Sequence, residues 1–275
     1  MPEKRQAPVR GRKARGVRRP ARAGRRMSSG HARPVALVTG STSGIGAAIA
    51  RRLSGDGYAV ILHSRSSADT GRAMARELGE AAYVQADLAD DAQRVRLIRD
   101  AIAVRGRLDV LVNNAGISRV IAHDDLAAAT PEVWREMHEI NVIAPFRLVA
   151  AAEAALRDAG SRGRPGCVVN VSSHAGVRPK GASIPYAAAK AALNHATRLL
   201  ARTLAPAIRV NAVAPGLVDT PLTADWTDAQ RLWREHAPMR RAATPDDIAQ
   251  MVAMLVASDY VTGEIVMLDG GLNLT

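Results

Sequence analysis

The chain has 275 residues, enough for one large α/β domain with a sizeable core, and a formal net charge of +12. That charge is concentrated in residues 1–34, which contain twelve Lys or Arg and a single acid, whereas the remainder contains 26 basic and 25 acidic residues. The nearly neutral body argues against a broad basic surface for nucleic acid, the single cysteine excludes an internal disulfide and fits a reducing cytoplasm, and no apolar stretch approaches the ~18 residues of a membrane span.

Residues 1–33 form a basic tail that is rich in Arg, Pro, Gly and Ala and has no hydrophobic period, so we expect it to be disordered. It lacks the apolar core of a secretory signal. Three interpretations stay open: a non-specific arm for polyanions, a targeting segment, or an extension upstream of the true translation start at Met27. We favour the third, with an inert tail next.

From residue 34 onward, short apolar runs alternate with amphipathic segments. The expected strands cover residues 34–39, 58–63, 82–85, 108–112, 167–171, 208–213 and 264–268. The expected helices cover 44–53, 68–78, 91–104, 131–158 with a bend at Pro145, 185–205 and 245–257. Continuous apolar strands between helices indicate a parallel sheet covered on both faces. We therefore predict one α/β domain over residues 34–275, a doubly wound parallel sheet of about seven strands that binds ligands at the carboxyl ends of its strands.

Residues 217–243 depart from this alternation. The stretch is polar, is bounded by Gly and Pro, and contains Trp226 and Trp233, two of the three Trp in the chain. We interpret it as a partly helical lid over the cleft, with ordinary packing of the two Trp as an equal alternative.

A glycine-rich turn, Thr39-Gly40-Ser-Thr-Ser-Gly44-Ile-Gly46, joins the first expected strand to the first expected helix. Glycines let the backbone approach a pyrophosphate closely, and the helix N-terminus supplies unpaired N–H groups and a partial positive charge. The turn residues that we expect to contact a dinucleotide are Gly40, Ser41, Ser43, Gly44, Ile45 and Gly46.

The second expected strand ends where the adenosine ribose of such a dinucleotide would lie. An acid there would bind both ribose hydroxyls, but the sequence supplies Ser64, Arg65 and Ser66 instead. This set can hold a 2′-phosphate, so we predict a preference for NADP(H) without excluding NAD(H).

Tyr186 and Lys190 are four residues apart and so share one face of the helix expected over 185–205. An ammonium beside a phenol should lower the pKa of the phenol, which suits proton transfer near neutral pH. The chain has only four Lys against 34 Arg, and a compact ammonium fits beneath a ring better than a guanidinium fork does. Ser173 follows the strand expected over 167–171, and from there its hydroxyl can point into the same cleft.

Together these motifs resemble the short-chain dehydrogenase/reductase family, in its 3-oxoacyl-carrier-protein-reductase-like branch, from about residue 34 to the C-terminus. The matching pieces are Thr39-Gly40-x-x-x-Gly44-x-Gly46, Asp87-Leu88, Asn113-Asn114-Ala115-Gly116, Asn141, Ser173, Tyr186-x-x-x-Lys190, Pro215-Gly216-x-Val218-x-Thr220, Tyr260-Val-Thr-Gly263 and Leu268-Asp269-Gly270-Gly271. The resemblance implies a Rossmann-type fold and an enzyme that interconverts a ketone and a secondary alcohol by hydride transfer with a nicotinamide dinucleotide.

The resemblance also assigns roles. Tyr186 would be the general acid or base, Lys190 would hold the nicotinamide ribose, Ser173 would orient the substrate oxygen, and Asn141 would fix a water that links Lys190 to solvent. The remaining cofactor contacts that it implies are Asp87 and Leu88 at the adenine, Asn114, Ala115 and Gly116 along the cofactor, and Pro215, Gly216, Val218 and Thr220 at the nicotinamide.

Other polar residues receive more ordinary interpretations. His174, beside Ser173, is interpreted as a surface histidine, and His63 has no partner that the sequence identifies. No cluster of His, Cys and Asp has metal-ligand spacing, so we expect no metal.

The substrate and the partners stay open. The substrate is expected to be a small carbonyl compound, free or linked to a carrier protein or CoA, such as a 3-oxoacyl thioester or a secondary-metabolite ketone. No specific nucleic acid and no membrane is expected as a partner, and the resemblance implies a cytoplasmic homotetramer or homodimer. Two other classes were weighed: a catalytically silent dinucleotide-binding regulator, and a nucleic-acid-binding protein driven by the tail.

Overall fold

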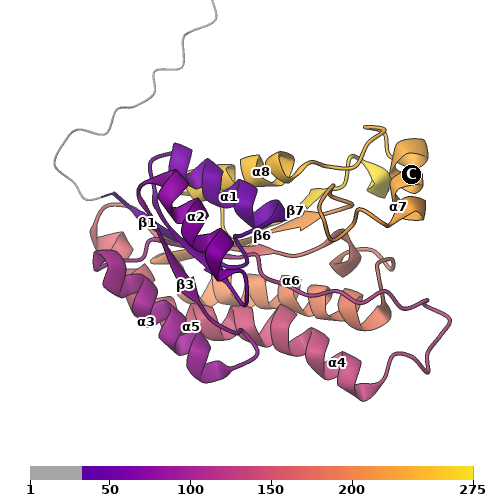
Figure 1. The fold of residues 1–275 in the computed structure, drawn as a ribbon, viewed down its shortest axis with the longest axis horizontal. Coiled ribbons are helices and arrows are strands. Elements are labelled where there is room, and N and C mark those ends of the chain that lie inside the picture. The colour runs from indigo at the N-terminus through magenta and orange to yellow at the C-terminus, as the bar shows by residue number, and fades with distance from the viewer. Residues whose placement is uncertain (1–32, 275) are drawn as a thin grey trace, which may run out of the picture. The chain divides into compact units, whose positions relative to one another are not determined.

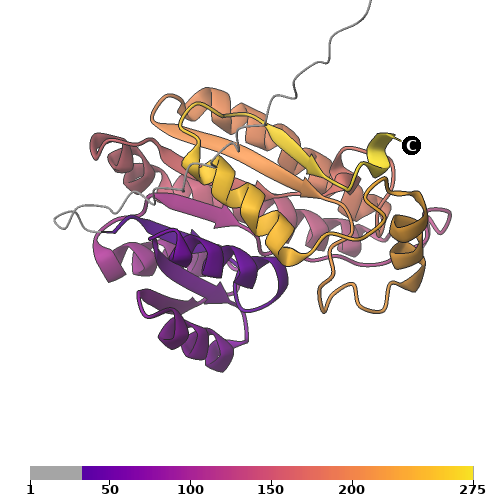
Figure 2. The same cartoon turned by 90° about the horizontal axis from the view of Figure 1, so that it is seen from above.

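The computed structural model describes residues 33–274, so the predicted tail and the start at Met27 lie outside the described residues apart from Arg33 (Figures 1 and 2). Its seven strands are all parallel, in the order β3-β2-β1-β4-β5-β6-β7. The strands are β1 Val35–Val38, β2 Ala59–Ser64, β3 Ala81–Gln85, β4 Val110–Asn113, β5 Gly166–Val171, β6 Ile208–Pro215 and β7 Ile265–Leu268. The α-helices are α1 Gly44–Gly55, α2 Ala68–Leu78, α3 Asp91–Arg105, α4 Pro131–His138, α5 Ala144–Ser161, α6 Ile184–Leu204, α7 Thr227–His236 and α8 Pro245–Ala257.

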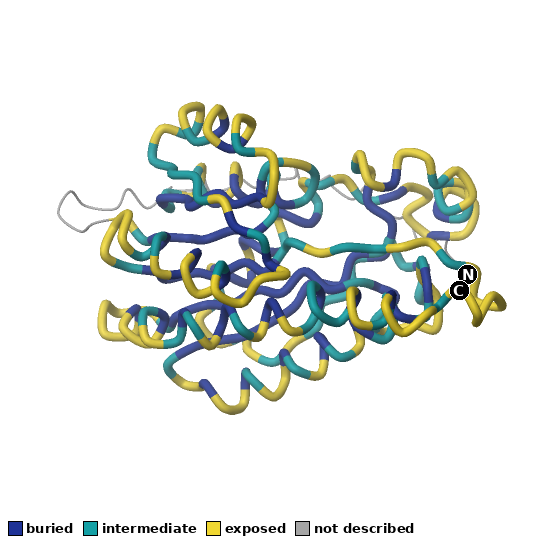
Figure 3. Tube along the Cα trace, turned by 60° about the horizontal axis from the view of Figure 1, so that its bottom comes forward, coloured by how far each residue is buried: buried dark blue, intermediate teal, exposed yellow. Residues whose placement is uncertain are grey.

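The strands are apolar because helices cover both faces of the sheet. Every residue of β1, β2, β4, β5 and β6 is buried, as the dark inner strands of Figure 3 show. One core lies between the sheet and α1, α2 and α8, and the other between the sheet and α3, α5 and α6 (Figure 1). The strand order reverses between β1 and β4, and in such sheets a crevice for ligands lies at the carboxyl ends of the strands at this point. The doubly wound sheet predicted from the sequence is confirmed.

The long helix predicted over 131–158 is divided into three parts. Between α4 and α5 lies a π-helical segment, Glu139–Ile143, in which the Ala144 N–H donates to the Glu139 carbonyl five residues earlier. Pro145 has no N–H to offer the carbonyl four residues before it, and its ring crowds that carbonyl. The wider π turn accommodates both effects, so the irregularity lies just before Pro145 and includes Asn141.

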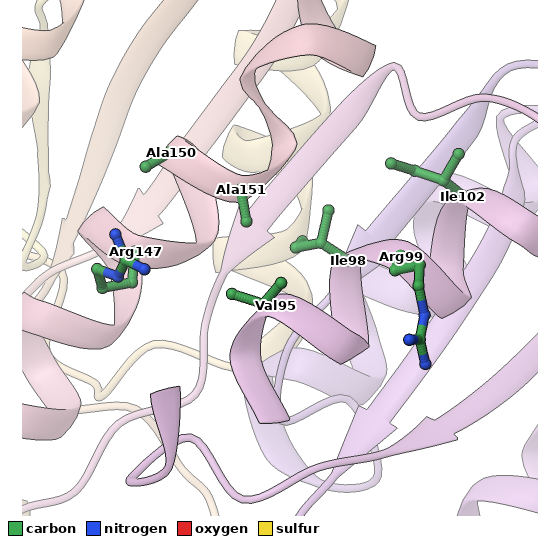
Figure 4. A pocket seen from close by; sticks show the side chains of 7 residues that line it. All are labelled: Val95, Ile98, Arg99, Ile102, Arg147, Ala150 and Ala151. Atoms are coloured by element: carbon green, nitrogen blue, oxygen red, sulfur yellow. The ribbon is translucent and has the colours of Figure 1, made fainter. Parts of the chain in front are cut away.

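Helices α3 and α5 lie side by side and leave a shallow groove between them (Figure 4). Apolar side chains of α3, among them Val95 and Ile102, face Ala150 and Ala151 of α5 across it, and Val95 is 46% exposed. None of the residues predicted to bind cofactor or substrate lines this groove. Among the helices described, none is long and apolar enough to cross a membrane.

Candidate active site

The glycine turn leaves space for an anion at the N-terminus of α1. Gly40 and Gly44 have positive φ angles of 62° and 50°. A Cβ atom on Gly46 would lie 2.2 Å from the Gly40 carbonyl oxygen, so only glycine fits there. Ser43 is the N-cap residue of α1, but its side chain makes no capping hydrogen bond. The first N–H groups of this helix therefore have no side-chain cap, which fits a bound phosphate.

A buried histidine, His63, supports this turn through hydrogen bonds that were not predicted from the sequence. The His63 Nδ1 atom accepts a hydrogen bond from the Gly40 N–H at 3.1 Å, and its Nε2 atom donates to the Ala86 carbonyl at 3.0 Å. Burial lowers the pKa of His63 to about 4, so the ring is neutral at pH 7 and keeps Nδ1 as an acceptor. Ser41 is fully buried and its hydroxyl accepts from the His63 N–H, so a ligand can meet only its backbone.

The segment after β4 packs against the same turn. The Thr39 hydroxyl oxygen accepts hydrogen bonds from the N–H groups of Asn114 and Ala115, both at 3.0 Å. The Asn114 amide in turn donates to the carbonyls of Thr39 and Gly40, at 2.9 and 3.1 Å. The Asn114–Gly116 segment is thereby fixed beside the glycine turn.

At the end of β2, the residues predicted to contact the adenosine differ in whether their side chains already have hydrogen-bond partners. Arg65 and Ser66 are exposed, and within residues 33–274 the Arg65 guanidinium makes no hydrogen bond or ion pair. The Ser64 hydroxyl, by contrast, is buried and is bonded to the Tyr83 hydroxyl at 2.8 Å and to the Ser67 N–H. Arg65 is therefore available to an anionic ligand, and the Ser64 hydroxyl already has partners.

The next strand end contributes Asp87 and Leu88. The Asp87 carboxylate accepts from the Ala89 N–H at 2.9 Å, and Leu88 is buried. The Leu88 carbonyl accepts from Arg94, a buried arginine that also pairs with Glu139 at the start of the π segment. One buried guanidinium thus connects the predicted adenine end to the helix that carries Asn141.

Ser173, Tyr186 and Lys190 converge at the ends of β5 and α6. Ser173 follows β5, and its hydroxyl accepts from the Ala175 N–H at 3.2 Å. Ser183 caps α6 by accepting from the Tyr186 N–H, which fixes the first turn of the helix that carries Tyr186 and Lys190. The Lys190 Nζ atom donates to the Val171 carbonyl at 2.9 Å and lies 5.8 Å from the centre of the Tyr186 ring.

The predicted effect of Lys190 on Tyr186 is wrong in this structure. Burial raises the pKa of Tyr186 above its usual value, and the hydrogen bond with Ser173 lowers it only in part. Burial also lowers the pKa of Lys190 to about 8. The single hydrogen bond of the amine goes to Val171 rather than to the phenol, and desolvation disfavours both charged forms.

Asn141 is fully buried and holds the chain after Gly116. Its amide donates to the Ile117 carbonyl at 3.0 Å and accepts from the Ile117 N–H at 3.3 Å. A Cβ atom on Gly116 would lie 2.8 Å from the Asn141 Oδ1 atom and 3.4 Å from the Lys190 Nζ atom. Glycine at 116 therefore lets both groups approach the backbone from one side.

The cleft has a volume of ≈ 620 Å³, a size suited to a small-molecule ligand. The predicted residues that line it are Ile45, Asn114, Gly116, Asn141, Ser173, Tyr186, Lys190, Pro215, Gly216, Val218 and Thr220. The predicted residues that do not line it are Gly40, Ser41, Ser43, Gly44, Gly46, Ser64, Arg65, Ser66, Asp87, Leu88 and Ala115. From the predicted lid, residues 217–243, the side chains of Leu222, Trp226 and Trp233 line the cleft, Trp233 from α7.

His174 is buried, contrary to its interpretation as a surface residue. It lies 6% exposed beside Ser173, lines the cleft, and packs against Trp233 of the lid. Its Nε2 atom is 3.6 Å from a carboxylate oxygen of Asp269, which follows β7. Across residues 33–274 no group of three or more His, Cys, Asp or Glu could hold a metal ion.

The fold and the cleft define a class of dinucleotide-binding α/β proteins, and comparison with known proteins identifies the family. The family model described as enoyl-(acyl carrier protein) reductase matches residues 40–273. A protein named as ketoacyl reductase 2 of the granaticin polyketide synthase, from Streptomyces violaceoruber, is 49% identical over 244 residues, which cover 88% of this chain and 96% of that protein.

Two solved structures share the fold. The RhlG protein of Pseudomonas aeruginosa, in an active-site complex with NADP, has a TM-score of 0.80 and 32% identity, covering 87% of this chain and 96% of that one. The 3-ketoacyl-(acyl-carrier-protein) reductase of Brucella melitensis, in complex with NADH, has a TM-score of 0.80 and 31% identity, covering 87% and 98%. The chain belongs to the short-chain dehydrogenase/reductase family and is an oxidoreductase.

Proposed function

We propose that the protein is an NADP(H)-dependent ketoreductase that interconverts a ketone and a secondary alcohol. The observation that carries this proposal is the convergence of Ser173, Tyr186 and Lys190 in one cleft, which also reaches Asn114 and Gly116 beside the glycine turn. A hydroxyl pair and a buried amine at the end of a dinucleotide-binding crevice suit proton transfer to a carbonyl oxygen.

The residues present fit a nicotinamide dinucleotide. The glycine turn and the α1 N-terminus would hold the pyrophosphate, Arg65 the 2′-phosphate, and Lys190 the nicotinamide ribose. When bound, the reduced cofactor supplies the hydride that side chains cannot provide. The related structures hold NADP in one case and NADH in the other, and the exposed Arg65 with no acid beside it favours NADP(H).

The chain itself supplies orientation and the proton. The Ser173 hydroxyl would hold the substrate oxygen, and the Tyr186 hydroxyl would donate its proton to that oxygen. A raised pKa keeps Tyr186 protonated and ready to donate. Lys190, with a pKa of about 8, is mostly charged at pH 7 and would stabilise the phenolate that the donation leaves. Asn141 would hold the water through which Lys190 exchanges protons with solvent.

The substrate is best described as a bulky apolar ketone. The lid end of the cleft is formed by Leu222, Trp226, Leu232 and Trp233, which offer apolar and aromatic surface. The relative at 49% identity is named as a polyketide ketoacyl reductase, which favours a polyketide-type or other secondary-metabolite ketone as the substrate. A simple 3-oxoacyl thioester is the second candidate.

The decisive experiment follows NADPH consumption across ketones and 3-oxoacyl thioesters with wild type and Tyr186→Phe. Loss of the proton donor should lower kcat by about 10²–10⁴-fold while NADPH binding, measured by fluorescence, is retained. Tyr260→Phe is the matched control, because Tyr260 is fully exposed. Cofactor binding without turnover of any carbonyl compound in wild type would instead support a silent regulator.

The protein should assemble through α5 and α6, as its family resemblance implies. Ile143 at the end of the π segment, Phe146 in the first turn of α5 and Leu199 of α6 are about half exposed. Exposed apolar side chains on helices are a common feature of interfaces. Light scattering should show a dimer or tetramer, and a monomer would contradict this part of the proposal.

A further inference from the structure

Trp233 is the buried residue of helix α7 and packs that helix against neighbouring strand ends. Trp233 is 9% exposed and lies against Gly216 at the end of β6, where a Cβ atom would come within 2.7 Å of the indole ring. It belongs to a small separate core, whose buried members are Leu217, Trp233, Ala237, Ala242 and Leu272. The lid helix thus has a fixed attachment above the cleft.

The His174 ring lies against the indole, and Asp269 lies beside His174 at a neighbouring strand end. The His174 ring meets Trp233 edge-on, with ring centres 6.0 Å apart, and its Nε2 atom is 3.6 Å from Asp269. The Asp269 Cα atom would lie 3.1 Å from a Cβ atom on Gly216, so all three strand ends meet at this point. Trp233 therefore packs against His174, which in turn lies beside Asp269.

The contact between His174 and Asp269 is electrostatic, because 3.6 Å is longer than a standard hydrogen bond. Burial lowers the pKa of His174, which favours the neutral ring. The carboxylate nearest to Nε2 favours the tautomer that carries its proton on that nitrogen. Asp269 is held in turn by the N–H groups of Gly271 and Asn273, at 3.0 and 2.8 Å.

We propose that the His174–Asp269 contact positions Trp233 and thereby sets the width of the substrate end of the cleft, which makes this pair a determinant of which ketones the enzyme accepts. His174 and Trp233 line the same cleft as Ser173 and Tyr186, so a shift of the indole changes the wall that faces those hydroxyls. The inference rests on the proposed ketoreductase function and assigns a positioning role, since neither His174 nor Asp269 is placed at the reacting atoms.

The kinetic test compares His174→Leu with His174→Gln, because the Gln amide can still donate to Asp269 and the Leu side chain cannot. The substrates are a two-ring ketone, 2-tetralone, and a smaller one, cyclohexanone. His174→Leu should raise KM for 2-tetralone by about ten-fold and KM for cyclohexanone by less than about three-fold, with kcat and the cofactor KM nearly unchanged. His174→Gln should restore most of the wild-type KM.

Equal changes for both ketones, or equal defects in the Leu and Gln variants, would overturn the proposal. His236→Gln is the control, because His236 is an exposed histidine on the same lid helix. An unchanged KM for 2-tetralone in His174→Leu would also refute it.

A second readout does not depend on turnover. Trypsin cleavage after Arg231 and Arg234, two exposed residues of α7, should be about ten-fold faster in His174→Leu than in wild type or His174→Gln if the helix loses its attachment. The unfolding midpoint, measured in parallel, separates local release from global destabilisation. A wild type that reduces no ketone would contradict the proposed function, and the cleavage rates would still decide the role of His174; equal rates would reject it.

Discussion

Burial of the charged Lys190 side chain destabilises the folded state. Its side chain is 4% exposed, and burial lowers its pKa from 10.5 to about 8. The folded state therefore binds this proton less tightly than the unfolded chain does. The resulting destabilisation is complete below pH 8, shrinks between pH 8 and pH 10.5, and is absent above that range. At pH 7 it amounts to about 3 kcal/mol.

Lys190→Met should consequently stabilise the fold at pH 7 while abolishing turnover. The substitution removes the burial penalty of about 3 kcal/mol, but the Val171 carbonyl loses a hydrogen bond worth about 1 kcal/mol, so the free energy of unfolding should rise by about 2 kcal/mol. This gain in stability should vanish by pH 10. Thermal unfolding at the two pH values measures it, with the exposed Lys180→Met as control. A lower unfolding midpoint for Lys190→Met at pH 7 would show that the buried charge of Lys190 does not destabilise the folded protein.

Arg65 should decide between the two nicotinamide cofactors. Its guanidinium is exposed and unengaged among the described residues, and a charge-assisted bond to a phosphate is worth about 1.5–3 kcal/mol. Arg65→Ala should raise KM for NADPH by about 10–100-fold and leave KM for NADH within about two-fold. Steady-state kinetics with both cofactors tests this, and Arg72→Ala, an exposed arginine of α2, is the control. Equal losses for both cofactors would reject the phosphate assignment.

At this scale the sequence predicted the groups whose partners are near or whose spacing is regular. Tyr186 and Lys190 meet because they are one helical turn apart, and Ser173 joins them at a strand end. His63 and His174 escaped prediction because their partners lie far along the chain: Gly40, Ala86 and Asp269. The pKa of Tyr186 could not be predicted either, since it depends on burial that only the packed cleft creates.

Among the elements, the turn before α1 imposes the strictest requirement on a side chain. Gly46→Ala should destabilise the protein and weaken dinucleotide binding by at least about ten-fold, because the new Cβ atom would collide with the Gly40 backbone and with the Asn114 amide. The matched control is Gly55→Ala at the other end of the same helix, where a Cβ atom meets nothing within 4 Å.

The control should gain stability, by up to about 1 kcal/mol, because alanine favours the helix more than glycine does. Denaturant unfolding and NADPH titration of the two variants separate the effects. If Gly46→Ala bound NADPH as wild type does, the turn could not be the pyrophosphate cradle.

Element boundaries were predictable where local signals fix them. Helices α2 and α8 begin and end where the sequence predicted, and a capping box between Thr244 and Asp247 starts α8. Pro145 marked an interruption of the helix predicted over 131–158 but not its form, the π segment Glu139–Ile143. Local periodicity also gave no sign that Asn141 within this segment is hydrogen-bonded to Ile117, 24 residues earlier.

For the whole molecule, the alternation of buried strands and amphipathic helices was sufficient to predict the doubly wound sheet. Both cores, the cleft and every candidate site residue lie between residues 33 and 274. The body is almost neutral, and the positive charge belongs to the first 34 residues. The net positive charge and the candidate site residues therefore lie in different parts of the sequence.

Deleting residues 1–26 should accordingly leave the enzyme intact and change only its response to polyanions. The truncated chain begins at Met27 and loses eleven Lys or Arg and one acid. Its unfolding midpoint and its kcat/KM for ketones should match those of the full chain, because no described core or site residue is removed. Binding of the full chain to heparin should weaken steeply with salt and should be largely absent after the deletion, since it would come from counterion release by the tail. Heparin or DNA binding that survives the deletion would place a polyanion site on the body, and a fall in kcat/KM would give the first 26 residues a part in the reaction.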